Sequence, residues 1–254
     1  MFRHKGSRRT YKHNLRLAAM LSFVAGLVNV TGVLAVNTLT TNVTGHFAYF
    51  AEELVNKHYG IALVFLLFIV FFLLGAFVSN VLVELISRIN PKISHSGPMV
   101  LEILVLVTAG MYGISNVLSQ TEAYTIAYSL LFAMGLQNAL VTQVSQFTVR
   151  TTHLTGLFTD LGIELSQLFF YRKTSEFQRL IKSIRLRIFI IVFFFLGCVT
   201  GGFLFTLFNL KTLLVAAVCL TIAFMYDNLL YRFYFLKRKL VKRQFSRTER
   251  RYPL

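Results

Sequence analysis

Two short threonine-rich segments carry the side chains in this sequence that could bind a solute. The first reads Thr40-Thr41-Asn42-Val43-Thr44-Gly45, and the second reads Thr151-Thr152-His153-Leu154-Thr155-Gly156, preceded by Arg150. Thr and Asn side chains can accept hydrogen bonds from the free N–H groups that open a helix, and such a helix start attracts anions. The residues therefore indicate either helix caps that only join helices or a binding centre for a small polar or anionic solute.

The two segments belong to an internal repeat, a feature that has to be recognised before the fold is predicted. Gly26-Leu27-Val28-Asn29 precedes the first segment, and Gly135-Leu136-Gln137-Asn138 precedes the second. Glu53-Leu54 and Glu164-Leu165 follow at the same distance from each segment. We therefore predict one site that combines residues of both copies: Asn29, Thr40, Thr41, Asn42, Thr44, Gly45, Gln137, Asn138, Arg150, Thr151, Thr152, His153, Thr155 and Gly156.

The composition is that of a multi-pass helical membrane protein. Of the 254 residues, 56% are hydrophobic, the mean hydropathy is +0.64, and apolar runs reach the length of a membrane span. The predicted spans are about 17–36, 61–86, 98–118, 123–144, 188–209 and 212–231. The stretches 44–56 and 155–170, which follow the threonine-rich segments, are predicted as short helices that do not span comfortably, although an interfacial, re-entrant or spanning position is left open.

The basic residues predict the topology. The formal net charge is +16, but 23 of the 26 Lys and Arg residues fall in tails and loops that a six-span topology places on one side. By the positive-inside rule, both termini are then cytoplasmic and Lys57 is outside. This distribution argues against binding of nucleic acid. An eight-span topology, in which both short helices cross, would move Arg88 and Lys92 outside and is the second choice.

Six spans and two copies give three spans per copy, so the second copy enters the membrane from the opposite side. Such inverted repeats are typical of secondary transporters. The predicted fold class is an all-α integral membrane protein with two inverted three-helix repeats, each containing a short helix after the threonine-rich segment. The predicted divisions are a basic tail at 1–16, repeat 1 at 17–118, repeat 2 at 119–232 and a second basic tail at 233–254.

The Gly26/Asn29 element, the Gly135-Leu136-Gln137-Asn138 element and the threonine-rich segments resemble those of the YoaK-like family, bacterial multi-pass membrane proteins with a domain of unknown function. The resemblance covers roughly residues 17–232 and implies a bacterial inner-membrane protein without implying a substrate. Two positions depart from the family pattern. Asn29 stands where relatives often have Asp, so no proton can be carried there, and His46 stands where they often have Asn.

Three classes of function are compatible with these features. The first is a small secondary transporter or permease for a small polar or anionic solute, with its site at the repeat interface. The second is a non-transporting scaffold or partner-binding subunit. An intramembrane enzyme is a poor third, because no catalytic, phosphate-binding or metal-ligating signature is present. We expect no catalytic residue, metal or cofactor. The expected partners are the lipid bilayer and the solute, with a homodimer left open.

Two acidic residues, Glu102 and Asp227, are the most apt to lie within spans. One interpretation of either residue is a carboxylate that reaches the membrane interface or pairs with a nearby cation, and this interpretation is favoured for Asp227. Asp227 is adjacent in sequence to the basic residues that begin at Arg232.

Overall fold

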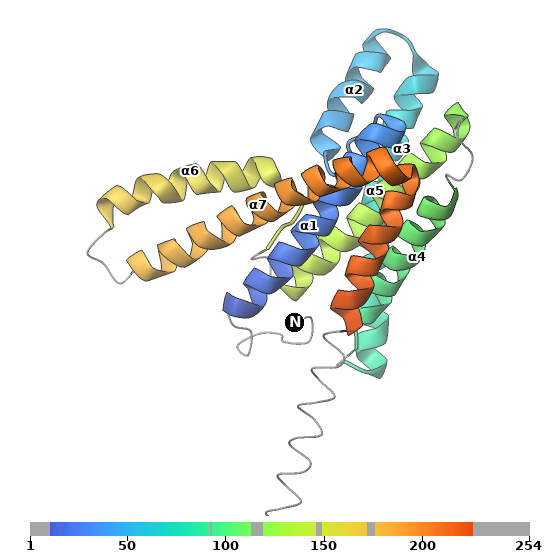
Figure 1. The fold of residues 1–254 in the computed structure, drawn as a ribbon. Coiled ribbons are helices and arrows are strands. Elements are labelled where there is room, and N and C mark those ends of the chain that lie inside the picture. The colour runs from blue at the N-terminus through green and yellow to red at the C-terminus, as the bar shows by residue number, and fades with distance from the viewer. Residues whose placement is uncertain (1–10, 92, 113–118, 146–148, 172–175, 226–254) are drawn as a thin grey trace, which may run out of the picture.

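The structure, a computed structural model, describes residues 11–91, 93–112, 119–145, 149–171 and 176–225, and these residues form helices and turns without a strand (Figure 1). The helices are α1 (Tyr11–Val36), α2 (Val43–Val55), α3 (Tyr59–Ile89), α4 (Ser96–Tyr112), α5 (Gln120–Val144), α6 (Leu154–Phe170) and α7 (Phe177–Phe208). A 3-10 turn, η2 (Asn209–Lys211), follows α7 and leads into a helix over 212–225.

Four stretches are long and apolar enough to cross a membrane: Leu15–Val36, Tyr59–Ile89, Gln120–Val144 and Phe177–Met225. The last contains two helices, because the chain folds back at Asn209, which has the positive φ of 50°. The shorter α4 is also apolar. The described part of every predicted span range is therefore helical, and the apolar helices are those of a membrane-embedded protein.

One boundary prediction was wrong. The fifth span was predicted to begin at about residue 188, but α7 begins at Phe177, so the helix starts earlier in the chain. The reason is tertiary packing: Ser183 and Arg187 hydrogen-bond to α6, which holds these first turns of α7 in place. Residues 1–10 and 226–254, which contain most of the predicted tails and Asp227, lie outside the described residues, as do 113–118 at the predicted end of the third span.

The two equivalent helices α1 and α5 form the centre of the bundle. Within the most apolar window of each span, 50% of α1 and 61% of α5 are buried, against 17% of α3 and 22% of the Phe177–Met225 stretch. The buried side chains of α1 and α5 include Leu21, Leu27, Leu130 and Leu136. The outer helices therefore cover a core that is built from α1 and α5.

Four glycines allow close backbone contact within two pairs of helices, α1 with α7 and α3 with α5. A methyl group on Gly26 of α1 would lie 2.0 Å from the carbonyl oxygen of Phe194 in α7, and one on Gly197 would lie 2.0 Å from that of Phe23 in α1. A second pair of helices, α3 and α5, repeats this arrangement. A methyl group on Gly75 would lie 2.1 Å from the carbonyl oxygen of Phe132, and one on Gly135 would lie 2.1 Å from that of Phe72. Only glycine permits such close helix packing.

The direction of each helix follows from its contacts. Helices α1 and α7 are parallel, since Phe23 lies against Gly197 and Leu27 against Gly201. Helices α3 and α5 are also parallel, since Phe68 contacts Tyr128 and Asn80 accepts a hydrogen bond from Gln143. The central helices α1 and α5 are antiparallel, because Leu21 contacts Gln137 whereas Gly32 lies near Leu130. The parallel pair of α1 and α7 therefore runs in the opposite direction to the parallel pair of α3 and α5.

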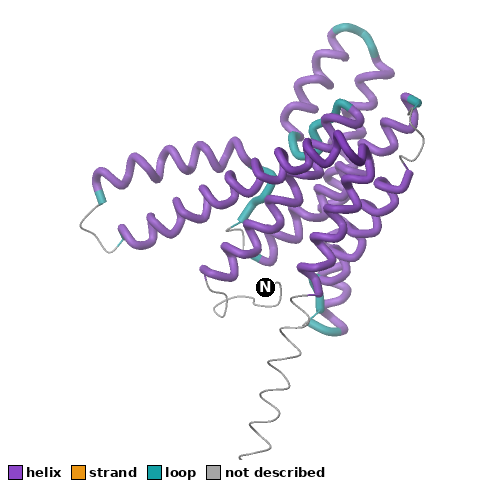
Figure 2. The backbone as a smooth tube through the Cα atoms, viewed as in Figure 1, coloured by secondary structure: helices purple, strands orange, loops and turns teal. Residues whose placement is uncertain are grey.

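Each short helix packs on the start of the next long helix. Helix α2 packs against α3, and α6 packs against α7. The two hairpins project from the bundle in different directions, as Figure 1 shows. The non-helical segments before α2 and α6 lie at different ends of the central helices (Figure 2). We call residues 37–42 the first break and residues 149–153 the second break.

Candidate functional site

The first break is held against α1 by one carboxamide group. The Asn29 Oδ1 atom accepts hydrogen bonds from the backbone N–H of Thr41 at 3.3 Å and from its hydroxyl at 3.0 Å. The Thr40 hydroxyl lies 3.5 Å from the same oxygen. The chain can double back in this way because Asn37 adopts φ 52°, a left-handed conformation that Asn tolerates better than most residues. Asn29 therefore satisfies polar groups that would otherwise be unpaired inside the bundle.

The start of α2 is capped by Asn42 and not by a threonine. The Asn42 Oδ1 atom accepts a hydrogen bond from the backbone N–H of Gly45 at 3.0 Å, as expected for a helix N-cap. Gly45 leaves room for this cap, because a methyl group there would lie 2.7 Å from the Asn42 Nδ2 atom. Thr44 is exposed. Of the Thr and Asn side chains that the sequence offers as caps, Asn42 is the one that caps α2, and Thr40 and Thr41 face Asn29 instead.

His46, which follows Gly45, links the first break to α3. His46 is buried, and its Nε2 atom donates to the carbonyl oxygen of Leu39 at 2.8 Å. Its ring lies edge-on to Phe68 at a centroid distance of 5.1 Å. Burial lowers the pKa of His46, and the hydrogen bond to Leu39 opposes that shift to a smaller extent. A neutral histidine therefore connects the first break to α3.

The second break differs from the first in its hydrogen bonds. Asn138 is the counterpart of Asn29, yet its Oδ1 atom is buried without a hydrogen-bond partner among the described residues. The hydroxyl of Thr151, the counterpart of Thr40, is likewise buried and unpartnered. The break is anchored instead at Ser145, which accepts a hydrogen bond from the Val149 backbone N–H at 2.9 Å. The two breaks thus differ: the first is bonded to Asn29, and the second has no described bond to the Asn138 oxygen.

At the start of α6, as at the start of α2, the side chain at the N-cap position lies against the glycine three residues later. His153 occupies the N-cap position without a side-chain capping bond. Its ring lies over Gly156, where a methyl group would come within 2.5 Å of the ring. Both glycines of the threonine-rich segments therefore clear space for the residue three positions earlier. Thr152 is buried, and Thr155 is exposed.

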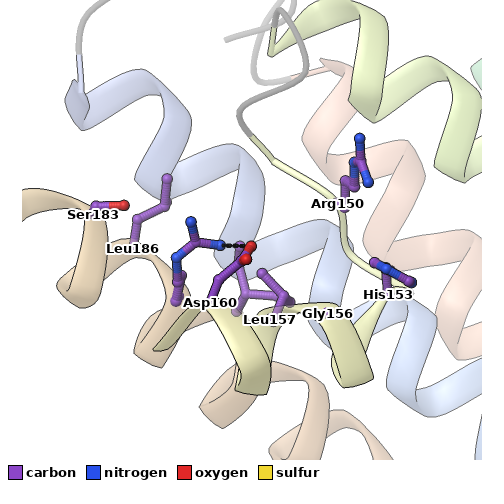
Figure 3. A pocket seen from close by; sticks show the side chains of 9 residues that line it. Arg150, His153, Gly156, Leu157, Asp160, Ser183 and Leu186 are labelled. Carbon is purple, nitrogen blue, oxygen red and sulfur yellow. Dashed lines mark hydrogen bonds and ion pairs between the residues drawn. The ribbon is translucent and has the colours of Figure 1, made fainter. Parts of the chain in front are cut away.

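A cavity of about 300 Å³ lies beside the second break. Its lining comes from the break, from the start of α6 and from α7: Arg150, His153, Gly156, Leu157, Asp160, Ser183, Leu186, Arg187 and Ile190. Figure 3 shows Arg150 and His153 on the break, apart from Asp160 on α6. Three residues predicted from the sequence, Arg150, His153 and Gly156, are thus brought together at this cavity.

Among the described residues around the cavity, Arg187 is paired with two carboxylates, and Arg150 is not paired with any. Arg187 of α7 donates to Glu164 from its Nε and Nη2 atoms at 2.8 Å and 3.0 Å and to Asp160 from Nη1 at 2.7 Å. Both carboxylates are therefore occupied. Arg150 is exposed and forms no ion pair with a described residue. Together with the first N–H groups of α6, Arg150 provides positive charge that an anion could use.

Gln137, at the centre of the bundle, is also polar and fully buried. Its Nε2 atom donates to the carbonyl oxygen of Leu21 at 2.6 Å, which joins α5 to α1. Its Oε1 atom and the hydroxyl of Ser22, the residue that follows Leu21 in α1, have no hydrogen-bond partner among the described residues. No hydrogen bond between described residues joins the first break to the second.

Sequence reasoning missed two features. Glu102 is buried within the bundle: it is 1% exposed, and its Oε1 atom has no partner among the described residues. The reciprocal helix contacts were also missed, although the pattern Phe-x-x-Gly occurs at Phe23, Phe72, Phe132 and Phe194 and could have revealed them. In the part of the chain that the structure describes, no group of His, Cys, Asp and Glu could hold a metal ion.

Comparison with known proteins gives a family but no function. The sequence profile of one family, described as "Protein of unknown function (DUF1275)", matches residues 17–226. No curated protein and no solved structure matches the chain.

Proposed function

The chain belongs to this family of unknown function, and we propose that it is a small permease that carries a small polar or anionic solute across the bacterial inner membrane. The observation that carries the proposal is the difference between the two breaks. Asn29 holds Thr41 in the first break, whereas Asn138 and Thr151 are buried without partners in the second. A transporter that opens alternately to each side needs two equivalent gates in unequal states.

The packing of the helices supports an inverted repeat. A rotation that exchanges α1 with α5 would also exchange α7 with α3, and it would carry the Gly26–Phe194 contact onto the Gly135–Phe72 contact. The antiparallel direction of α1 and α5 fits an axis in the membrane plane. We therefore propose that the two halves are related by inversion, with six spans, cytoplasmic termini and Lys57 outside.

The cavity beside the second break is the proposed entrance to the solute site. A volume of about 300 Å³ lies at the small end of the range found for ligand pockets. Asp160 is already bonded to Arg187, which leaves the Arg150 guanidinium and the start of α6 to attract an anion. The unpartnered oxygens of Asn138, Thr151 and Gln137 could then bind polar groups farther inside the bundle.

Solute binding can be tested by thermal stabilisation of the purified chain in detergent with a panel of small inorganic and carboxylate anions. A ligand that binds the folded state and not the unfolded state raises the unfolding temperature, and the rise grows with the logarithm of ligand concentration above Kd. At least one anion should stabilise the native chain, Arg150→Ala should abolish that shift, and Thr155→Val, which removes only an exposed hydroxyl, should reduce it less.

Three results would count against this site. An equal shift in Arg150→Ala would show that the arginine only fixes topology or packing. Stable co-purification with another protein, together with no stabilisation by any anion, would favour the scaffold or partner-binding function instead. Unfolded Arg150→Ala protein would likewise make the arginine a structural residue.

A further inference from the structure

One buried carboxyl group has no place in the solute site described above. Glu102 lies on the face of α4 that is turned into the bundle, together with Met99, Leu106 and Ala109. It is 1% exposed, and its Oε1 atom has no hydrogen-bond partner among the described residues. The other glutamates whose side chains the structure describes are exposed or hydrogen-bonded, as Glu53 is to His58, Glu122 to Ser119 and Glu164 to Arg187. Among the described glutamates, Glu102 therefore combines burial with an unpartnered side-chain oxygen.

The described residues of the helices around α4 supply no charge to balance it. On α3, Glu84 and Arg88 are exposed near the C-terminal end, and on α5 the only charged residue, Glu122, lies in the first turn and is bonded to the Ser119 cap. Lys211 of η2 is exposed, and the helix over 212–225 contributes the thiol of Cys219 but no charged residue. His95, which is buried, precedes the first turn of α4. No described residue forms an ion pair with Glu102.

An unpaired carboxylate inside a membrane bundle is costly, and the cheaper state is the neutral acid. Ionisable residues that lie within membrane spans commonly serve as proton relays. Metal binding is the other use of a buried carboxylate, but the described residues provide no set of ligands for it. The neutral acid is also a hydrogen-bond donor, which a buried carboxylate is not.

We infer that Glu102 is a proton-binding site, protonated while the bundle is closed around α4. When α4 becomes hydrated, the carboxyl O–H bond breaks, the proton passes to water, and the remaining carboxylate is stabilised by hydration. The reverse step takes a proton from water before the bundle closes. This inference rests on the proposed function in one respect: if the chain is a permease, proton binding at Glu102 couples its opening to the proton gradient.

Infrared spectroscopy of the full chain in lipid nanodiscs tests the protonation directly, with the proton as the only ligand. At pH 7.5 the native chain should show the carbonyl stretch of a protonated carboxylic acid, and labelling with ¹³C-glutamate should shift that band. Glu102→Gln should lack the band, and the matched control Glu84→Gln, at an exposed position of α3, should retain it. Absence of a glutamate-sensitive band from the native chain would overturn the inference even if Glu102→Gln does not fold.

Cysteine labelling tests the coupling in a chain whose Cys198 and Cys219 are replaced by alanine. Buried Thr151→Cys is compared with exposed Thr155→Cys, which corrects for the pH dependence of the thiol reaction. Between pH 6 and pH 9 the labelling ratio should rise by about tenfold or more, since one titrating group can change an equilibrium up to tenfold per pH unit. The ratio should change less than about twofold in Glu102→Gln.

The two proposals fail in different ways. A glutamate-sensitive band together with a pH-independent labelling ratio would overturn the coupling and leave the solute site unaffected. Absence of solute binding in the thermal assay, with the band and the pH-dependent ratio present, would reject the permease and keep the proton site.

Discussion

The side-chain oxygen of Asn29 accepts two hydrogen bonds from Thr41, one from the backbone N–H at 3.3 Å and one from the hydroxyl at 3.0 Å. Twelve residues separate the two partners, so these bonds fold the first break back onto α1. Asn138 occupies the matching place on α5, and its oxygen has no partner among the described residues. This difference between equivalent residues leads to a direct comparison.

Asn29→Leu should destabilise the chain much more than Asn138→Leu. Removing the acceptor at position 29 leaves the Thr41 N–H unpaired inside the bundle, which costs about 1–3 kcal/mol. Removing the unpaired oxygen at position 138 carries no such penalty. Thermal unfolding in detergent measures both variants. Equal losses would show that the two asparagines play the same role in this state.

The glycines at the helix crossings give a second comparison. Gly26→Ala and Gly135→Ala each place a methyl group about 2 Å from a backbone carbonyl oxygen, so both should lower the unfolding temperature strongly or prevent folding, because the backbone cannot move aside. At Gly162 of α6 no atom lies within 4 Å of the added methyl group. Gly162→Ala should therefore raise helix stability by about 0.5–1 kcal/mol. Similar effects at all three positions would contradict the crossing geometry.

The helices could be predicted well from the sequence, because long apolar runs separated by basic loops are typical of helical membrane bundles and of few other folds. The short helix after each threonine-rich segment could also be predicted, since polar groups such as those of Asn42 interrupt the apolar pattern. No pattern indicated that Thr40 and Thr41 bind Asn29 and leave the capping of α2 to Asn42. The burial of Glu102 was equally hidden, because the distance of a residue from the interface depends on how α4 is tilted and covered.

His46 predicts a dependence of stability on pH. Burial lowers its pKa from the ordinary value of 6.5, so the folded state binds fewer protons than the unfolded state. The corresponding stability is fully present above about pH 6.5 and is lost as the pH falls towards the lowered pKa. Unfolding temperatures should therefore fall more steeply below pH 6.5 in the native chain than in His46→Gln. Parallel pH curves for the two proteins would contradict a buried neutral histidine.

Arg187 predicts how α6 is held. Arg187→Met removes the hydrogen bonds to Glu164 and Asp160 and leaves the Glu164 carboxylate, which is 14% exposed, without its cation. Hydrogen exchange in α6 should then become faster, while α2 remains protected. The control is Arg185→Met, because Arg185 is exposed and lies over the Phe189 ring. Faster exchange in both variants would mean that α7 itself had been disturbed.

The proposed topology predicts an asymmetry of surface labelling. In the chain without native cysteines, an impermeant reagent applied to the outside of cells should modify Lys57→Cys but not Lys92→Cys. Position 57 follows α2, and position 92 lies outside the described residues. Modification of Lys92→Cys from the outside would reject the six-span topology and favour eight spans.

Uptake of an isotopically labelled anion into sealed proteoliposomes tests the central claim most directly. The anion is one that stabilises the purified chain, and liposomes without protein measure the leak. We predict uptake that is saturable with the native chain, absent with Arg150→Ala and reduced with Thr155→Val, at equal amounts of folded protein. Uptake by the native chain that does not exceed the leak, or full uptake by Arg150→Ala, would contradict a permease whose solute site lies beside the second break.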